Sequence, residues 1–335
     1  MYNISMQEKN VRKVLFLRIG AIGDIIHTLN APRALKEIYP EVEIYYLANI
    51  SAEFLTGVPY IDKPLVLPSM KHMKIFSKSM RETAKMIKAE NFDMVINLQP
   101  SIKTRLLMRL AGIKKVYNYR KNKHHAVMNY WETVKRAFPK ISLAKDLKYS
   151  LKQQYLETIK PQIENLKKPL IIFNAGHVFA KRQGRTYPIE KWIELGNLIQ
   201  NKYDGTIVIT GVKADAEVLK PLENIKNSIS FVDKLSLQEN SALISFSDLL
   251  ISGDSGPLHI AASLGVKAIG LFGSMPISRT GPYGENCHTI LSPKKCSPCN
   301  HIKCKYLKKT KELYAPCMKE IEPLEIFKKV EEILS

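Results

Sequence analysis

The 335-residue chain is 45% hydrophobic and 24% charged, a composition typical of a globular protein that excludes a disordered or fibrous one. Its length exceeds the size at which a single core usually stops growing, so we expect two domains. The chain has 51 Lys and Arg against 31 Asp and Glu, a formal net charge of +20, which favours an anionic partner such as nucleic acid, an anionic membrane surface or a phosphorylated substrate.

No run of 18 apolar residues occurs, and residues 1–10 (MYNISMQEKN) lack the apolar core of a signal peptide. We therefore expect a cytoplasmic protein.

The first predicted unit is a strand, a glycine turn and a helix. Lys13–Arg18 (KVLFLR) is an apolar strand, Gly20 and Gly23 lie in the turn, and an apolar-periodic helix runs to about residue 38. Asp24 lies at the start of this helix, where a carboxylate can cap the helix, pair with Arg18 or act as a base. Two glycines three residues apart are weak support for a nucleotide loop, because the full dinucleotide fingerprint is absent.

Three more strands are predicted in the first half, at Glu43–Leu47, Pro64–Leu67 and Phe92–Leu98. Met70–Lys88 is predicted as a long basic helix, either a solvated surface helix or one lying on an anionic membrane surface. A loop and a further helix follow from Gln99.

Basic residues gather again at Arg120–His125 (RKNKHH), which suits phosphates and acidic sugars but is equally typical of a solvated loop. Residues 140–168 are rich in Lys and Gln and are followed by Pro169. We place the domain boundary there, with domains at 1–165 and 166–320 and a terminal segment at 321–335.

The second half repeats the alternation of strands and helices. Strands are predicted at Leu170–Phe173, Gly205–Thr210 and Ile229–Val232, with a helix at Ser236–Phe246. After the second of these strands, Asp215 or Glu217 could accept hydrogen bonds from ribose hydroxyls, and the spacing does not decide between them.

The most informative stretch is 249–273, LLISGDSGPLHIAASLGVKAIGLFG, which predicts a strand, a tight turn, a helix and a strand. Ser255 is a good N-cap, Pro257 suits the first helical turn, and Gly256 lets a ligand approach the backbone N–H groups. A helix N-terminus of this kind favours a phosphate. Asp254 could bind a ribose hydroxyl, cap the turn or orient His259.

Four cysteines near the end follow the pattern C-x2-C-x4-C-x12-C, a spacing typical of structural metal ligands in a cytosolic chain. They are Cys296, Cys299, Cys304 and Cys317. A structural zinc or iron, buried thiols and a redox-formed disulfide all fit this pattern. We expect no catalytic metal, because the site motifs lack a carboxylate pair that would hold a metal on a nucleotide sugar.

The order of strands and helices predicts two doubly wound parallel sheets, with ligands at the carboxyl ends of the strands. Two motifs resemble those of the bacterial heptosyltransferases, glycosyltransferase family 9. They are R-x-G-x-x-G-D-x-x-x-T from Arg18 to Thr28, and D-S-G-P-x-H-x-A-A-x-x-G from Asp254 to Gly265. The loop before Tyr187-Pro188 is similar as well.

The resemblance implies the GT-B architecture, two Rossmann-like domains facing a cleft, with the helix Pro323–Leu334 packing back on the N-terminal domain. It implies an inverting enzyme that moves heptose from ADP-heptose to the inner core of lipopolysaccharide, with no cofactor required for catalysis. Asp24 is then the catalytic base, and Arg185 faces the donor diphosphate.

The resemblance also implies two sets of binding residues. The donor set is Asn174, Gly176, Lys181, Gly211, Asp215, Glu217, Asp254, Ser255, Gly256, Pro257 and His259. The acceptor set is Arg18, Gly23, His27, Gln99, Arg105 and Arg120.

The expected partners are ADP-heptose, an anionic glycolipid and, peripherally, the inner face of the inner membrane, without nucleic acid. Two alternatives stay open. The enzyme could use another nucleotide sugar, or a protein or other glycan as acceptor. A chain of net charge +20 with a four-cysteine loop could also be a nucleic-acid-binding protein.

Overall fold

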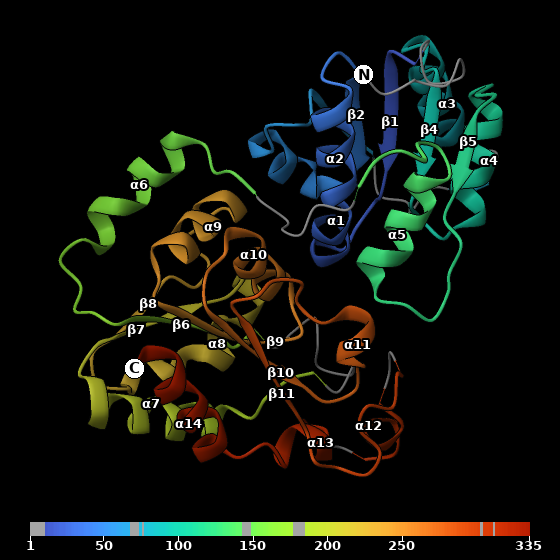
Figure 1. Ribbon diagram of the computed structural model, residues 1–335. Coiled ribbons are helices and arrows are strands. Elements are labelled where there is room, and N and C mark those ends of the chain that lie inside the picture. The colour runs from blue at the N-terminus through green and yellow to red at the C-terminus, as the bar shows by residue number, and fades with distance from the viewer. Residues whose placement is uncertain are drawn as a thin grey trace. The chain divides into compact units, whose positions relative to one another are not determined.

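The computed structural model describes residues 11–67, 74–75, 77–142, 149–176, 185–301, 304–310 and 312–335 (Figure 1). The chain divides into two compact units, residues 1–150 and residues 151–335.

The N-terminal unit contains a five-stranded, all-parallel sheet in the order β3-β2-β1-β4-β5. Its strands are β1 Lys13–Leu17, β2 Glu43–Ala48, β3 Lys63–Val66, β4 Met94–Asn97 and β5 Val116–Asn118. Its helices are α1 Ile22–Thr28, α2 Asn30–Ile38, α3 Lys78–Ala89, α4 Ile102–Leu110 and α5 Ala126–Lys135, with a 3₁₀ helix, η1, at Ile50–Gly57.

The central strand explains why this sheet forms. Residues 14–17 of β1 are fully buried, and β1 pairs in parallel with β2 on one side and β4 on the other. A parallel strand covered on both faces needs a continuous apolar run, which VLFL supplies. Leu15 and Leu17 pack with Met80 and Ile87 of α3 and Leu107 of α4, so α3 and α4 cover the same face of the sheet.

Two helix predictions in this unit need correction. The helix predicted to run to residue 38 is divided at Leu29 into α1 and α2. The predicted helix Met70–Lys88 begins only at Lys78, because the Ser77 side chain accepts a hydrogen bond from the Met80 N–H and caps α3 there. The start of that prediction, residues 70–73, lies outside the described residues.

The C-terminal unit contains a six-stranded, all-parallel sheet in the order β11-β10-β9-β6-β7-β8. Its strands are β6 Leu170–Asn174, β7 Thr206–Thr210, β8 Ser228–Ser230, β9 Leu249–Gly253, β10 Ala268–Phe272 and β11 Cys287–Leu291. The prediction of two doubly wound parallel sheets is thus confirmed.

Helices pack around this second sheet (Figure 1). They are α6 Gln153–Ile163, α7 Ile189–Tyr203, α8 Ala216–Leu219, α9 Leu237–Phe246, α10 Gly256–Leu264, α11 Ile277–Thr280, α12 Lys305–Lys309, α13 Pro316–Lys319 and α14 Pro323–Leu334, with 3₁₀ helices η2 at Lys213–Asp215 and η3 at Lys220–Asn224.

The unit boundary and the last helix differ from the prediction. The units separate between Ser150 and Leu151, so α6, which we assigned to the first domain, belongs to the second, where it packs on α9. The helix α14 was expected on the N-terminal domain. Instead, Ile326 and Val330 are fully buried in the core of the C-terminal unit, because the apolar face of α14 packs on α7.

Within the described ranges, every helix is too short or too polar to span a bilayer.

Candidate functional site

In each sheet the chain order reverses beside the first strand of the unit. In the N-terminal sheet β1 lies between β2 and β4, and in the C-terminal sheet β6 lies between β7 and β9. Ligands of open α/β sheets bind outside the carboxyl ends of the strands at such a switch point. The candidate site residues that follow β1, β4, β6 and β9 are therefore placed where a ligand is expected.

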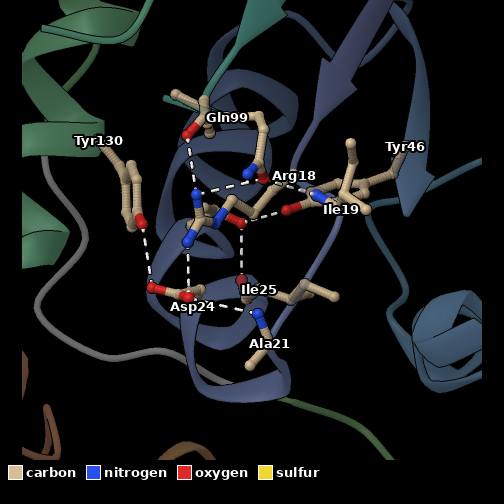
Figure 2. A network of polar contacts seen from close by, with 10 residues as sticks. Arg18, Ile19, Ala21, Asp24, Ile25, Tyr46, Gln99 and Tyr130 are labelled. Atoms are coloured by element: carbon tan, nitrogen blue, oxygen red, sulfur yellow. Dashed lines mark hydrogen bonds and ion pairs between the residues drawn. The ribbon is translucent and has the colours of Figure 1, made fainter. Parts of the chain in front are cut away.

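Asp24 is the centre of the network at the first switch point, shown in Figure 2. Its Oδ2 lies 2.6 Å from Nη2 of Arg18, and the Ala21 N–H donates to the same oxygen over 3.3 Å. Asp24 occupies the third position of α1 rather than the cap itself. Of the structural roles considered for Asp24, the pairing with Arg18 is present, whereas the N-cap is Ala21; the Asp24 carboxylate instead closes the first turn of α1 through the Ala21 N–H.

Arg18 is held by more than this ion pair. Its side chain is only 8% exposed, and its Nη1 donates to Oε1 of Gln99 over 3.2 Å. The same Gln99 oxygen accepts from the Ile19 N–H, which fixes the amide between the ends of β1 and β4. Burial lowers the pKa of Arg18, but Tyr130 and Asp24 together raise it above the ordinary value, so the guanidinium stays charged.

Tyr130 is a member of this network that the sequence did not predict. Its hydroxyl donates to Oδ1 of Asp24 over 3.2 Å, and the Arg18 guanidinium lies 5.5 Å from the centre of its ring. Burial, with Asp24 next in importance, raises the pKa of Tyr130, so the hydroxyl remains a donor. Tyr130 is 106 residues from Asp24 and has no motif around it, so no local signal points to it.

The two oxygens of Asp24 are not equivalent. Oδ2 accepts two hydrogen bonds, one of them from a charged group, whereas Oδ1 accepts one bond from a neutral hydroxyl. The side chain is 35% exposed. Oδ1 is therefore the atom with capacity to accept a proton from an incoming hydroxyl group.

Thr28, the last residue of the first motif, has a structural role. Its buried hydroxyl donates to the Ile25 carbonyl over 2.6 Å and lies 2.5 Å from the Tyr46 hydroxyl. The pair ties the end of α1 to β2.

The remaining predicted acceptor residues are spread over α1, α4 and the loop after β5. Gly23 is buried within α1, and His27 is buried with its ring 5.1 Å from that of His125. Arg105 is exposed on α4. Arg120 lines a separate surface cleft with Arg136. The structure joins Arg18, Asp24 and Gln99 of the predicted residues through an ion pair and a hydrogen bond, while Gly23 and His27 lie near Asp24 on the same helix.

At the second switch point the network is made of neutral groups. Asn174, at the end of β6, donates through Nδ2 to the Thr210 hydroxyl of β7 over 3.1 Å. Its Oδ1 accepts from the Ser252 and Ser255 hydroxyls over 3.2 and 3.3 Å, and these two hydroxyls lie 2.7 Å apart. Thr210 and Ser252 were not predicted as site residues.

This network leaves the start of α10 open. Ser255 is the N-cap of α10 as predicted, but its side chain bonds to Asn174 and Ser252 and makes no capping hydrogen bond. Pro257 lies in the first turn, and Gly265 ends the helix in the left-handed conformation, with φ at 73°. The first-turn N–H groups can therefore serve an anion.

Arg185 and Asp254 form an ion pair beside this helix start. Their Nη1 and Oδ2 atoms are 3.2 Å apart, and the Asp254 side chain is only 8% exposed. A β-carbon on Gly253 would lie 2.8 Å from the Arg185 carbonyl oxygen, so glycine is needed for this approach. Nε2 of His259 lies 3.8 Å from Oδ1 of Asp254, which agrees with the orienting role considered for Asp254.

Of the two carboxylates after β7, Asp215 is buried and Glu217 is exposed. Oδ2 of Asp215 accepts from the Val212 N–H over 3.3 Å and lies beside Gly176 and Gly211. Asp215 therefore holds the loop after β7 in place. Lys181, predicted for the donor set, lies outside the described residues.

No disulfide joins the four cysteines, of which Cys317 is buried, Cys299 and Cys304 are half-buried and Cys296 is exposed. Burial, then the neighbouring Cys296 and Cys304, raises the pKa of Cys317 to about 11. In the part of the chain that the structure describes, which includes all four, no three His, Cys, Asp or Glu side chains are placed to hold one metal ion. The predicted metal site is therefore not confirmed.

Comparison with known proteins points to one family. The family model described as glycosyltransferase family 9 (heptosyltransferase) matches residues 80–310. The lipopolysaccharide heptosyltransferase 1 of Campylobacter coli is 26% identical, over 96% of this chain and 98% of that protein. The lipopolysaccharide core heptosyltransferase OpsX of Haemophilus influenzae is 24% identical, over 84% of each.

Solved structures share the fold over nearly the whole chain. The ADP-heptose lipopolysaccharide heptosyltransferase II of E. coli has a TM-score of 0.76 at 17% identity, covering 96% of this chain and 98% of that one. The E. coli heptosyltransferase WaaC, solved with ADP, has a TM-score of 0.73 at 19% identity, covering 96% and 99%.

Proposed function

The chain belongs to glycosyltransferase family 9, the heptosyltransferases, and from that premise we propose that it transfers heptose from ADP-heptose to the inner core of lipopolysaccharide, at the lipid A–Kdo region or the first heptose. Relatives named as lipopolysaccharide heptosyltransferases align over almost their full length, which supports this donor and acceptor.

The proposed reaction is a direct displacement with inversion. A hydroxyl oxygen of the acceptor, bound to the N-terminal unit, attacks the anomeric carbon of the donor, bound to the C-terminal unit. The new glycosidic bond forms as the bond from the anomeric carbon to the diphosphate breaks. The hydroxyl proton passes to Oδ1 of Asp24, and ADP leaves with the bonding electron pair. General-base catalysis of this kind contributes about 10²- to 10⁴-fold to the rate.

Arg18 and Tyr130 hold the base in place. Since both donate to the Asp24 carboxylate, they fix its orientation toward the incoming hydroxyl. Gln99 in turn fixes Arg18. These three residues position the base, and Asp24 carries the proton.

The leaving diphosphate is stabilised by fixed donors. The first-turn N–H groups of α10 and the guanidinium of Arg185 converge on the carboxyl end of β9. Negative charge that develops on a departing diphosphate is best stabilised by donors that need not reorganise. In this proposal Arg185 turns from Asp254 to the diphosphate, or bridges both.

The proposed chemistry needs no metal, since a guanidinium and a helix N-terminus take the part of a divalent cation at the diphosphate. Cys296, Cys299, Cys304 and Cys317 are candidates for a structural zinc or iron site only. Elemental analysis of protein purified under reducing conditions tests this: about one metal per chain supports the site, and none leaves four free thiols.

The single observation that carries the proposed reaction is the partly exposed Asp24 carboxylate at the first switch point, with one oxygen open to a hydroxyl. The alternatives within the family are another nucleotide sugar as donor, and a protein or other glycan as acceptor. The nucleic-acid alternative predicts binding to oligonucleotides, whereas the enzyme is expected to bind ADP and not oligonucleotides at moderate salt.

One experiment tests donor and acceptor together. The protein is incubated with ADP-heptose and lipid A–inner-core acceptors, and the product is detected by mass. A gain of one heptose unit supports the proposal. Transfer from a different nucleotide sugar, with none from ADP-heptose, would replace the donor assignment.

The acceptor also suggests a location. Because the lipid A part of the acceptor lies in a membrane, we propose that the enzyme works in the cytoplasm as a peripheral protein at the inner face of the inner membrane. The high positive charge of the chain is consistent with an anionic surface.

A further inference from the structure

The surface formed by the outer sides of α3 and α4 and the loop 111–115, here called the α3–α4 face, combines positive charge with exposed apolar side chains. The two helices carry seven Lys and Arg against one carboxylate, Glu82. Lys114 and Lys115 extend the positive charge beyond α4, and both are exposed.

The two helices lie side by side in one layer that covers the sheet. Met80 and Ile87 of α3 and Leu107 of α4 are buried against the same face of the sheet, and the helices pack on each other. Their opposite sides therefore form one outer surface, next to the edge strand β5 (Figure 1). The one carboxylate of the two helices, Glu82, lies 3.9 Å from Lys78, too long for a strong ion pair, so it offsets little of the positive charge.

Apolar side chains lie among these cations. Ile102 is 76% exposed, and Ile75, Leu110 and Met86 are 46, 39 and 37% exposed. A groove of about 590 Å³ lies along α4 and is lined by both kinds of residue, among them Ile75, Ile102, Arg105, Leu106, Arg109 and Lys114.

This combination identifies the partner by its chemistry. A nucleic acid would be bound by the cations alone, and exposed Ile and Leu side chains between them would gain nothing from phosphates. The interface of an anionic bilayer accommodates both, since the cations meet lipid phosphates while the apolar side chains enter the headgroup and acyl boundary. We propose that the α3–α4 face binds an anionic lipid bilayer.

The position of the face agrees with the chemistry of the site. Ile102 begins α4 three residues after Gln99, whose side chain holds Arg18. The Ile102 end of the face thus lies at the carboxyl edge of the N-terminal sheet, where Asp24 is placed, and the face extends from there toward the amino edge, where Lys114 and Lys115 precede β5. The inference rests on the proposed glycolipid acceptor, and it adds which surface of the enzyme meets the membrane.

The test measures binding of the full chain to vesicles of phosphatidylcholine alone and of phosphatidylcholine with phosphatidylglycerol. Wild type is expected to sediment with the anionic vesicles only, and less so as salt is raised. The double variant Arg109→Glu/Lys114→Glu should weaken this binding by about tenfold or more. Ile102→Asp should weaken it as well, because it replaces an exposed apolar side chain by a carboxylate while all the cations of the face remain.

Matched controls come from the C-terminal unit. Lys220→Glu/Lys328→Glu makes the same charge change at exposed residues. Leu324→Asp is the control for Ile102→Asp, since Leu324 is 52% exposed and also lies in the first turn of its helix, α14. These variants should keep wild-type vesicle binding. If they lose as much binding as the α3–α4 variants, binding follows net charge and the proposal is wrong.

Two further measurements keep the result interpretable. The milder variant Arg109→Gln/Lys114→Gln, with thermal melts of all variants, covers the case in which charge reversal impairs folding. Transfer to a soluble, deacylated acceptor should be equal in wild type and all variants.

Failure of wild type on that acceptor would count against the proposed function. Unchanged vesicle binding by the folded Arg109→Glu/Lys114→Glu variant would instead overturn the assignment of the α3–α4 face. Binding of wild type to an oligonucleotide but not to anionic vesicles would also overturn it.

Discussion

The two sheets carry different chemistry at equivalent points. Beside β1, a carboxylate and a guanidinium form a 2.6 Å ion pair, braced by a tyrosine and a glutamine. Beside β6, an asparagine and three hydroxyls form a network without formal charge, and the one ion pair nearby, Arg185 with Asp254, lies at its edge. The first arrangement can accept a proton, and the second can receive an anion. The same topology thus presents two kinds of chemistry.

The distribution of charge follows a similar division. Residues 1–150 contain 26 Lys and Arg against 12 Asp and Glu, a net charge of +14, whereas residues 151–335 contain 25 against 19, a net charge of +6. The excess therefore lies mainly in the unit that holds Asp24. An anionic acceptor on this unit explains that excess better than the donor nucleotide does, since the C-terminal unit needs only a few local donors for a diphosphate.

Asp24→Asn is expected to have the largest effect, because it removes the proton acceptor while keeping the shape of the side chain. Turnover should fall by about 10²- to 10⁴-fold, with ADP affinity near that of wild type. Calorimetry with ADP and a single-turnover assay with acceptor measure the two quantities. A variant that keeps more than about a tenth of wild-type turnover, where chemistry limits the rate, would remove Asp24 from the mechanism.

Asparagine also leaves the buried Arg18 without its counter-ion, which by itself destabilises a protein. Arg18→Gln and the double variant Asp24→Asn/Arg18→Gln separate the two effects. The double variant should recover stability but stay inactive if Asp24 is the base. Recovery of turnover in the double variant, which lacks both the proton acceptor and the ion pair, would show that the loss in Asp24→Asn came from the unpaired guanidinium and not from a missing base.

Arg185→Gln tests the C-terminal unit and should lower turnover by about 10²-fold, since it removes one fixed donor from the leaving diphosphate. The loss should appear in kcat more than in ADP affinity, because the charge develops in the transition state. Arg185→Lys keeps the charge without the bidentate geometry, and an intermediate loss is expected. Equal kcat for the Gln variant and wild type would leave Arg185 only its pairing with Asp254.

Tyr130→Phe should reduce kcat by about tenfold, the value of one hydrogen bond to a charged group, with little change in ADP affinity. Tyr46→Phe is the matched control. It removes another buried hydroxyl of the same unit, one that bonds to Thr28 and not to Asp24. The control should lower thermal stability and leave kcat per folded molecule unchanged. If both variants behave alike, Tyr130 supports the fold and not the base.

Most of the fold was predictable because buried parallel strands need apolar runs, and KVLFL, LIIF and LLIS are such runs. The boundary between the two units was not predictable. Residues 140–168 have the composition of a linker, but the helix α6 within them packs on α9 of the C-terminal unit. The placement of α14 depended on which surface its apolar stripe meets, and periodicity shows the stripe but not its partner.

The site was predictable only where motifs are local. Arg18, Asp24 and Ser255 lie in short motifs, and each is where the sequence placed it relative to a strand end. Tyr130 and Thr210 reach the site from other parts of the chain, since tertiary packing brings them there. The ion pair of Arg185 with Asp254 joins residues 69 positions apart, and no sequence pattern specifies it.

Ser255→Ala gives the smallest expected effect, and its contrast with Ser236→Ala makes the prediction specific. Both serines are helix N-caps, but only the Ser236 side chain caps its helix, accepting from the Glu239 N–H within a capping box. Ser236→Ala should therefore cost about 1 kcal/mol of stability and leave ADP affinity unchanged.

The Ser255 hydroxyl instead holds Asn174 and Ser252 in place at the start of α10. Ser255→Ala should therefore change stability less than Ser236→Ala does, but weaken ADP binding a few-fold, because one loosened hydrogen bond is worth about 0.5–1.5 kcal/mol. Thermal melts and ADP calorimetry on both variants give a crossed pattern if the hydroxyl network at β6 and β9 serves the nucleotide. If the two variants have equal ADP affinity and Ser255→Ala is the less stable, Ser255 is an ordinary helix cap. The contribution of this turn to anion binding would then come from the backbone N–H groups of α10 alone.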